Sequence, residues 1–459
     1  MKILPHRNSN TESKTATTGL KMPASINCSN YRNLIKAVPL ALFLILSLPV
    51  CAQNYSLFGT LDRPSPIYKP GEEMVFTVTL LDDDKAVVGR KLEWTRTGDD
   101  GITQKGENLS TQEGIKIITS TDSPGFVRIY VTALDENEKK IMGKDKDKSK
   151  PIFFDGGACV APDTLKGLPE PADFDDFWGK QKTVLASVPL KILEMKEIEG
   201  NDKVKAYDVK IACAGKMPVS GILVMPKDAK PKSLPAEVAF LGYSVSGAGK
   251  NLNEGKDKIY FQINAHGIEN GKPKEYYENL KNTTLKSYAF SQEENSKTET
   301  TYFNGMFMRI MRALQFVKSL PEWNGKDLRA VGGSQGGLQS LAAAGLDPDV
   351  TYCYAWSPWC CDFGRTELKR IVGGWYIKYT PALNYFDPIN LIKRANPKCQ
   401  LSIVSNLGDY VCPPSGVWIA YNNFPGPKTM EIRQGCEHGY RMKNYPTFTI
   451  CSKDWKSNK

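Results

Sequence analysis

Residues 54 to about 155 alternate apolar and polar side chains in short runs, and turn-forming residues such as Pro70, Gly71 and Asp82 separate these runs. Because successive side chains of a strand point to opposite faces, this period of two is typical of half-buried strands. The pattern predicts strands over 74–80, 91–94, 114–118 and 126–131. Strands recurring between turn signals predict a small all-β, immunoglobulin-like sandwich, which serves in sugar binding or as a spacer or docking domain.

The pattern changes after the Gly-rich segment 156–162, which we interpret as a linker. Strand-like and helix-like runs then alternate, as in an α/β layer fold. Apolar residues recur at helical spacing between 303 and 317, and Pro321 and Gly325 end that predicted helix before the next strand. A long polar stretch, 270–300, interrupts the layers, and we expect it to decorate the surface.

The first 52 residues have the layout of a leader. An apolar run, 38–50, follows Arg32 and Lys36 and precedes Cys51 and Ala52, as in a secretory signal peptide cleaved after Ala52. The run is about a dozen residues, whereas a membrane span needs roughly 20, so no integral membrane span is predicted. We expect a periplasmic or extracellular protein. Two alternatives stay open, a lipid on Cys51 and translation from Met22.

These patterns predict three parts, a leader and signal peptide over 1–52, a β-sandwich over 53–158 and a catalytic domain over 159–459. Without residues 1–52, which hold six Lys/Arg and one acid, the net charge falls from +10 to +5. The Lys-rich segment 139–150 carries interleaved Asp residues and predicts a solvated hairpin or linker. Nucleic acid is therefore not an expected partner.

Nine cysteines remain after the leader, so at least one thiol lacks an internal partner. Export permits disulfides, but a chain of this size does not need them. The only histidines beyond residue 52 are His266 and His438, and no cysteine pair has zinc-ligand spacing backed by them.

The strongest chemical signal is Gly-Gly-Ser334-Gln-Gly-Gly, which lies between a predicted strand at 328–331 and a predicted helix at 338–344. A G-x-S-x-G motif in this context is the nucleophile elbow of α/β-hydrolases, whose acid and then histidine follow the serine along the chain. His438 is the only histidine after Ser334. Asp409 ends the predicted buried strand that begins near 401 and lies between the two.

We therefore predict Ser334 as nucleophile, His438 as base and Asp409 as the residue that orients the histidine. Elbow geometry assigns the Gln335 amide to the oxyanion hole, and Tyr243, after an earlier strand, stands where the second amide is expected. Competing acids in the same part of the chain are Asp347, Asp349, Asp362, Asp387, Glu431 and Glu437.

With these residues, and the entry segment 171–178, Gly242-Tyr243 and Cys412-Pro413-Pro414, the chain resembles the acetyl xylan esterase and cephalosporin C deacetylase family, carbohydrate esterase family seven. The resemblance implies an α/β-hydrolase fold, the triad above, an oxyanion hole of the Tyr243 and Gln335 amides, an acetylated oligosaccharide or small ester as substrate, and no metal or organic cofactor.

Two departures limit what the resemblance implies. The family's Arg-Gly-Gln corresponds to Ala265-His266-Gly267, and its His-Glu to His438-Gly439. We expect a structural or surface role for His266, and the added sandwich leaves the family's homo-oligomeric hexamer open. Trp356, Trp359, Phe363 and Trp375 are candidates for a small acyl pocket or for ordinary core. Alternatives are a hydrolase of another acyl ester or peptide and a noncatalytic glycan-binding protein with a relic hydrolase domain.

Overall fold

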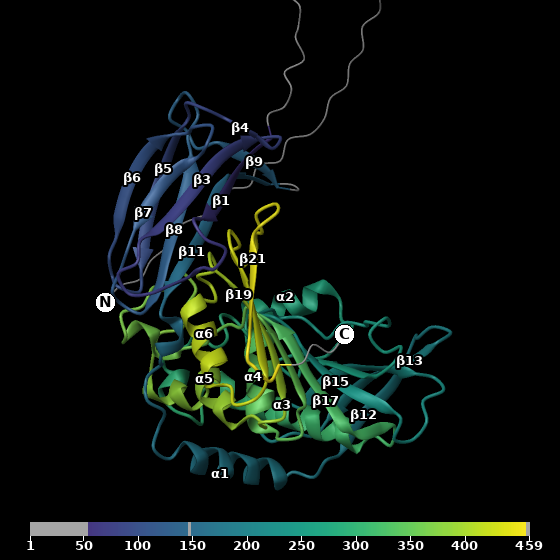
Figure 1. Ribbon diagram of the computed structural model, residues 1–459. Coiled ribbons are helices and arrows are strands. Elements are labelled where there is room, and N and C mark those ends of the chain that lie inside the picture. The colour runs from purple at the N-terminus through teal and green to yellow at the C-terminus, as the bar shows by residue number, and fades with distance from the viewer. Residues whose placement is uncertain (1–53, 146–147, 456–459) are drawn as a thin grey trace, which may run out of the picture. The chain divides into compact units, whose positions relative to one another are not determined.

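The computed structural model describes residues 54–145 and 148–455. The predicted signal peptide and Cys51 lie outside these residues. Two bodies of secondary structure follow one another along the described chain, a strand-rich part up to Val160 and a mixed α/β part after it (Figure 1).

The strand-rich part consists of two sheets. One contains four strands, β1 (Tyr55–Leu61), β3 (Met74–Asp82), β4 (Lys85–Ala86) and β7 (Ile115–Thr119). The other has the order β2 (Ile67–Tyr68), β11 (Phe153–Val160), β8 (Gly125–Ala133), β5 (Lys91–Gly98), β6 (Gln104–Leu109). Phe76 and Ile117 of the first sheet share a buried cluster with Ile129 and Val131 of the second. The inward faces thus form one core, which confirms the predicted sandwich.

The Lys-rich segment contributes an antiparallel pair, β9 (Met142–Asp145) and β10 (Lys148–Pro151). The linker predicted at 156–162 was wrong. Most of it belongs to β11, which pairs with β8 along its whole length. Its glycines are required by close packing, because an added β-carbon at Gly157 would lie 2.5 Å from the carbonyl oxygen of Val127.

The mixed part is built on a ten-stranded sheet. Its strands, in spatial order, are β12 (Ile192–Ile198), β13 (Val204–Ile211), β14 (Val219–Pro226), β16 (Ile259–Ile263), β15 (Leu234–Phe240), β17 (Trp323–Gly333), β18 (Tyr352–Trp356), β19 (Gln400–Asn406), β20 (Lys428–Arg433) and β21 (Thr447–Cys451). The strands from β16 to β20 are parallel, and antiparallel strands flank them. Parallel strands place their carboxyl ends at one edge, where ligands bind in open α/β sheets.

Helices connect these strands along the chain and lie beside the sheet (Figure 1). They are α1 (Phe174–Ala186), α2 (Lys274–Asn282), α3 (Tyr302–Ser319), α4 (Gln335–Leu346), α5 (Pro388–Leu391) and α6 (Pro414–Asn423). The predicted helix at 303–317 is α3, and its apolar stripe, including Ile310 and Leu314, is fully buried. The predicted helix after Ser334 is α4, which is buried along its whole length and packs against the central strands.

All nine cysteines of the described residues are free thiols, and Cys412 and Cys436 are not bonded to one another. Seven are buried, Cys213 is half-buried, and Cys451 in β21 is exposed. Searching the described residues finds no helix with the length and apolar character needed to cross a membrane.

Two glycines on helices give a matched test of this packing. In α1, Gly179 is exposed and an added β-carbon would contact nothing within 4 Å, whereas in α4 a β-carbon at Gly345 would lie 2.3 Å from the Leu391 carbonyl oxygen. We expect Gly179→Ala to raise the free energy of unfolding by about 0.5–1 kcal/mol through helix propensity. Gly345→Ala is expected to lower it by about 1–3 kcal/mol through the clash. Urea denaturation measures both, and stabilisation by Gly345→Ala would contradict the packing of α4 on α5.

Candidate active site

Ser334 occupies a sharp turn between β17 and α4. Its backbone has φ 56° and ψ −122°, a conformation that side-chain-bearing residues rarely adopt. The turn is held by its neighbours, because Ser334 N donates to Trp356 O at 2.9 Å and Ser334 O accepts from Trp359 N at 2.9 Å. This is the strained strand-to-helix elbow that the motif predicts.

Two glycines allow the chain to turn so tightly. A β-carbon at Gly332 would lie 2.5 Å from the main chain of Gly336, and one at Gly336 would lie 2.3 Å from the carbonyl oxygen of Phe240. Real side chains do not tolerate such contacts with backbone. The glycines thus bring the start of α4 against the end of β15.

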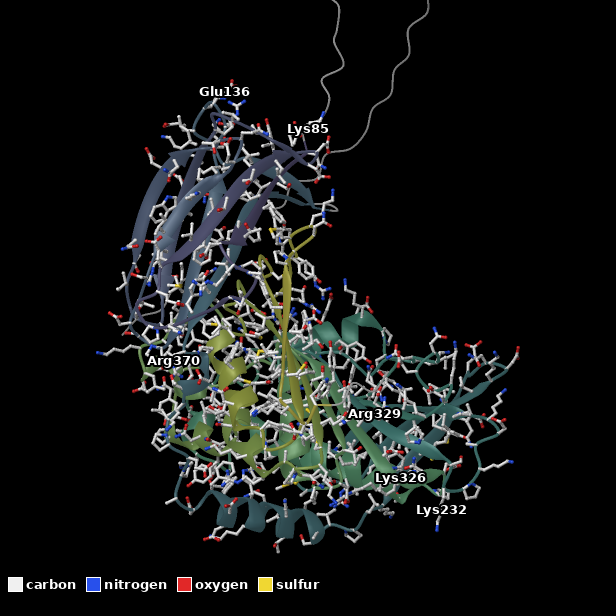
Figure 2. All side chains as sticks on the ribbon, in the orientation of Figure 1. Lys85, Glu136, Lys232, Lys326, Arg329 and Arg370 are labelled. Atoms are coloured by element: carbon white, nitrogen blue, oxygen red, sulfur yellow. The ribbon has the colours of Figure 1, made fainter. Side chains whose placement is uncertain are left out.

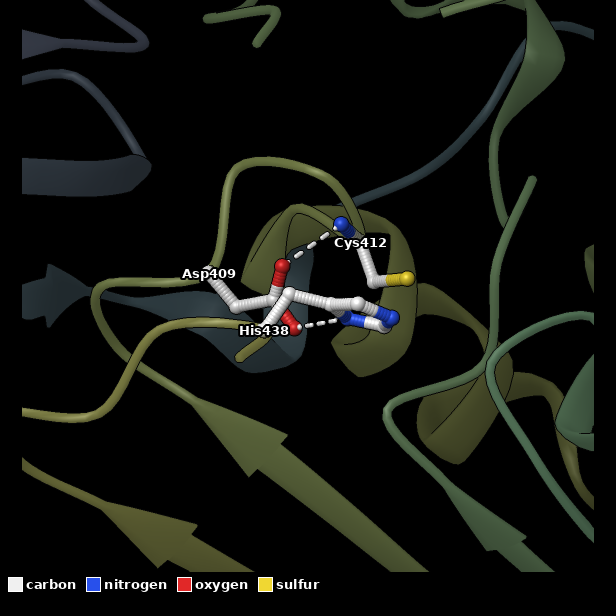
Figure 3. A group of neighbouring side chains, drawn as sticks. All are labelled: Asp409, Cys412 and His438. Atoms are coloured by element: carbon white, nitrogen blue, oxygen red, sulfur yellow. Dashed lines mark hydrogen bonds and ion pairs between the residues drawn. The ribbon is translucent and has the colours of Figure 1, made fainter. Parts of the chain in front are cut away.

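Asp409 and His438 meet at the same edge of the sheet. Asp409 follows β19 and His438 follows β20, two parallel neighbours, and His438 Nδ1 lies 2.8 Å from Asp409 Oδ2 (Figure 3). The other carboxylate oxygen of Asp409 accepts from the amides of Val411 at 3.1 Å and Cys412 at 2.8 Å. Asp409 has no solvent exposure, so these donors offset the cost of burying its charge.

The Asp409 pair sets the ionisation of His438. Burial alone would lower the pKa of the imidazole, but the hydrogen bond to Asp409, its charge and the charge of Glu437 outweigh burial and raise the pKa above 6.5.

Ser334 Oγ makes no hydrogen bond with the described residues, yet Trp356 contacts both Ser334 and His438. It accepts from Ser334 N, and its ring centroid lies 5.7 Å from that of His438. A catalytic hydrogen bond is often formed only in the substrate complex.

Cys412 lies beside this pair, and potential ligand atoms of Asp409, Cys412 and His438 are within 4.8 Å of one another (Figure 3). The chemistry of the donor set does not favour a metal. Both carboxylate oxygens already accept hydrogen bonds, and burial raises the pKa of Cys412 well above its usual value, so that the thiol keeps its proton. The three side chains fit a carboxylate–imidazole pair with a neutral neighbour.

Tyr243 lies in the segment after β15, next to the elbow. A β-carbon on Gly242 would lie 3.9 Å from Cβ of Ser334, so the main chain of this segment borders the nucleophile candidate. The structure therefore places Ser334, Gln335 and the Tyr243 segment next to one another, with Asp409 and His438 paired at the same sheet edge.

Tyr288 is a site residue that the sequence did not reveal. Its hydroxyl accepts from Ser244 N at 3.1 Å and donates to Gln335 Oε1 at 2.9 Å, which ties the Tyr243 segment to the start of α4. Its ring stacks on that of Tyr243 with centroids 4.1 Å apart. Tyr288 lies in the polar stretch expected to decorate the surface. That expectation was wrong for Tyr288 and Ala289, which are buried. The short apolar run Tyr-Ala-Phe at 288–290 was the only sequence signal for this burial.

His266 is buried behind the Tyr243 segment and does not have a surface role. Its Nε2 lies 2.8 Å from Ser244 O and its Nδ1 lies 2.7 Å from the Tyr302 hydroxyl. A carbonyl oxygen only accepts, so Nε2 carries the proton and Nδ1 accepts from Tyr302. Burial lowers the pKa of His266 to about 4, which keeps the ring neutral. The structural role predicted for His266 is thus the support of Ser244.

Aromatic side chains surround Tyr243. Its ring centroid lies 4.6 Å from that of Trp375, 5.4 Å from that of Trp359 and 5.9 Å from that of Phe290. Two of the four predicted acyl-pocket residues, Trp359 and Trp375, thus belong to this cluster. Trp356 packs on His438 instead, and Phe363 packs on Phe303, with ring centroids 5.2 Å apart.

The same cluster opens into a cavity of about 1030 Å³. Tyr243, Tyr288, Phe290 and Trp375 line it together with polar side chains of α2 and the segment that follows it. Apolar faces combined with hydroxyl groups suit a ligand that has both ring faces and polar edges.

The competing acids have other partners. Asp387 caps α5 through the Ile389 amide, and Asp362 pairs with Arg370, which is labelled in Figure 2. Asp347 and Asp349 pair with Lys318, and Glu431 with Arg433. Glu437 stands next to His438 without a hydrogen bond to its ring, and burial together with the charge of Asp409 raises its pKa.

The parallel sheet, the strained serine elbow and the order Ser, Asp, His define an α/β-hydrolase. Residues 165–371 and 378–456 match the family model described as acetyl xylan esterase, AXE1, and the chain belongs to that family of carboxylic ester hydrolases. The resemblance inferred from the sequence is confirmed.

A curated relative is an acetyl esterase, Axe7A, of Xylanibacter ruminicola. It is 27% identical over 303 residues, which are 61% of this chain and 66% of the relative, just under two thirds of its length. A similar solved structure is an acetyl xylan esterase from Paenibacillus sp. R4, with 26% identity and a TM-score of 0.50, covering 62% of this chain and 94% of that one.

The pKa values of the two histidines of the described chain are expected to be shifted in opposite directions from the ordinary value. NMR spectra of the imidazole groups over pH 3–9 will show His266 changing near pH 4, where burial places it, and His438 changing above 6.5. His266→Asn and His438→Gln variants assign the signals. Titration of His266 in the ordinary range near 6.5 would contradict its burial against Ser244 and Tyr302.

Proposed function

We propose that this chain is an exported serine esterase that removes acetyl groups from acetylated xylan fragments or related sugars through an acyl-enzyme. One observation carries the proposal, the strained Ser334 elbow and the 2.8 Å Asp409–His438 pair at one edge of the sheet in a member of the acetyl xylan esterase family. The leader segment supports export, and the catalytic roles rest on the geometry of the side chains.

In the proposed acylation, Ser334 Oγ attacks the acetyl carbonyl while His438 Nε2 accepts the hydroxyl proton. Asp409 stabilises the imidazolium and holds the ring with Nε2 facing the nucleophile. The same nitrogen then returns the proton to the departing sugar oxygen. Water, activated by His438, attacks the acetyl-enzyme and releases acetate, which restores Ser334.

The charge that develops on the carbonyl oxygen needs two fixed donors. We assign them to the backbone amides of Gln335, at the start of α4, and Tyr243. The partial positive charge at the N-terminus of α4 favours the anion as well. Tyr288 and His266 support this arrangement, because Tyr288 accepts from the Ser244 amide and His266 donates to the Ser244 carbonyl oxygen.

The aromatic cluster favours a short acyl group. Trp359, Phe290 and Trp375 pack around the Tyr243 ring, and we assign the acetyl group to the space that these bulky side chains border. The sugar would occupy the larger cavity, where ring faces stack on aromatic side chains and hydroxyl groups find polar partners.

Release of acetate from acetylated xylo-oligosaccharides tests the nucleophile. We expect Ser334→Ala to reduce kcat by roughly 10⁴–10⁶-fold, since removing the nucleophile leaves only oxyanion stabilisation and binding. The exposed Ser296→Ala serves as a matched control and should retain full activity. Equal release by Ser334→Ala and wild type would remove Ser334 as nucleophile, and activity on longer acyl esters alone would reject the acetyl substrate.

The pH dependence of kcat/KM tests the base. His438 accepts a proton only when neutral and its pKa is raised, so activity should be lost on the acid side with a midpoint above 6.5. Asp409→Asn removes the charge that raises this pKa. We expect its midpoint to move to lower pH while kcat falls by about 10³–10⁴-fold. A midpoint unchanged in Asp409→Asn would contradict the pairing.

A further inference from the structure

The sandwich contacts both loops that carry the Asp409–His438 pair. These loops, which we call the acid loop (407–412) and the histidine loop (434–442), follow β19 and β20. They are joined to one another, because Gly408 N donates to Cys436 O at 3.0 Å and Leu407 N donates to Arg433 O at 2.9 Å. Because Asp409 lies on one loop and His438 on the other, the relative position of the two loops sets the distance between carboxylate and imidazole.

Gln434 fixes the histidine loop to β11. Its side-chain Nε2 donates to Gly157 O at 2.8 Å and its Oε1 accepts from Gly157 N at 2.9 Å, so that the side-chain amide pairs with both backbone groups of one sandwich residue, as a neighbouring strand would. Gln434 is fully buried, and Gly435 N donates to the same Oε1 at 3.2 Å. Gln434 can approach β11 this closely only because residue 156 is glycine, since a β-carbon there would lie 2.3 Å from Gln434 Oε1.

The acid loop rests on the sandwich on both sides of Asp409. Before it, a β-carbon at Gly408 would lie 2.1 Å from the carbonyl oxygen of Asp155, so the two main chains touch. After it, the ring of Tyr410 lies under the guanidinium of Arg128, 4.3 Å from its centroid. Arg128 is held in turn by the buried carboxylate of Asp155, with Nε 2.8 Å from Oδ1.

The contact continues away from the loops. Phe126 of β8 packs on Trp418 of α6, with ring centroids 6.3 Å apart, and Phe153 of β11 packs on Tyr440, with centroids 4.8 Å apart. Phe126 belongs to the core of the catalytic sheet, whereas Met442 of the histidine loop belongs to the core of the sandwich. Each part thus contributes a side chain to the hydrophobic core of the other, close to the Asp409–His438 pair.

We propose that the sandwich is a positioning element of the esterase. Gln434, from the catalytic part, and Arg128 with Asp155, from the sandwich, are positioning residues that set the distance between Asp409 and His438. This inference rests on the proposed function. It assigns the sandwich a role in the reaction that requires no sugar binding by its strands.

Gln434→Met tests the proposal from the catalytic side, because methionine has a similar length and lacks both hydrogen-bonding atoms. We expect kcat for 4-nitrophenyl acetate to fall about tenfold with KM changed less than twofold. The acid midpoint of the pH profile should move to lower pH, since a looser Asp409 contact raises the pKa of His438 less. Arg128→Lys tests it from the sandwich side, where the charge stays beside Asp155 and the planar contact with Tyr410 is lost.

A spectroscopic readout separates positioning from general stability. The Nδ1 proton of His438, hydrogen-bonded to Asp409, gives a downfield resonance, which His438→Gln removes. Gln434→Met and Arg128→Lys should each shift or broaden it. Ile117→Ala is the matched control. It opens a cavity in the sandwich core from β7, which pairs with β3 and not with the strands that carry Gly157 and Arg128, and should lower the Tm while leaving kcat, pH profile and resonance unchanged.

Gln434→Met and Arg128→Lys with wild-type kcat, pH profile and resonance would overturn the proposal, whatever their Tm. If Gln434→Met does not fold, Arg128→Lys decides alone. An Ile117→Ala variant that reproduces the same kinetic changes would also overturn it, because stability would then explain them. Should the wild type hydrolyse no acetyl ester, the proposed function fails, and the His438 resonance still decides this inference.

Discussion

A carboxylate removed entirely from water is stable only where hydrogen bonds replace its hydration. Asp409 is such a carboxylate, so the loops around it must place hydrogen-bond donors against its oxygens. Two backbone amides and the imidazole of His438 supply the replacement. The amides need the chain to turn immediately after β19, and the imidazole needs the loop after β20 to fold back over that turn. The parallel order of the strands, which brings their ends to one edge, makes both turns meet.

The residues of the Asp409 pair and the elbow could be predicted from the sequence because their signals are local. Ser334 lies in a contiguous six-residue motif that can be read without knowing which distant residues its glycines contact, and the scarcity of histidine left His438 as the only candidate base. Asp409 was harder, since six other acids competed for the role. The structure places five of the competitors in caps or ion pairs, and Glu437 beside His438 without a hydrogen bond to its ring, which no local pattern records.

The residues that escaped prediction act through partners far along the chain. Tyr288 acquires its role from Ser244 and Gln335, and Gln434 from Gly157, more than 40 and 270 positions away respectively. The Gly-rich segment at 156–162 looked like a linker for the same reason. Its glycines fit the close approach of Gln434 and the acid loop, so the feature that suggests flexibility in sequence marks dense packing in the fold.

The cysteines of the described residues determine which chemistry the chain needs in order to fold. Seven of the nine in the described residues are buried as free thiols, and burial raises the pKa of those in the central core, so they react poorly with oxidants. Between residues 54 and 455, where the structure describes the chain, no disulfide is present for a reducing compartment to break. Folding of the described residues therefore requires no disulfide exchange, and Cys451 is the thiol that a solvent-borne oxidant reaches most readily.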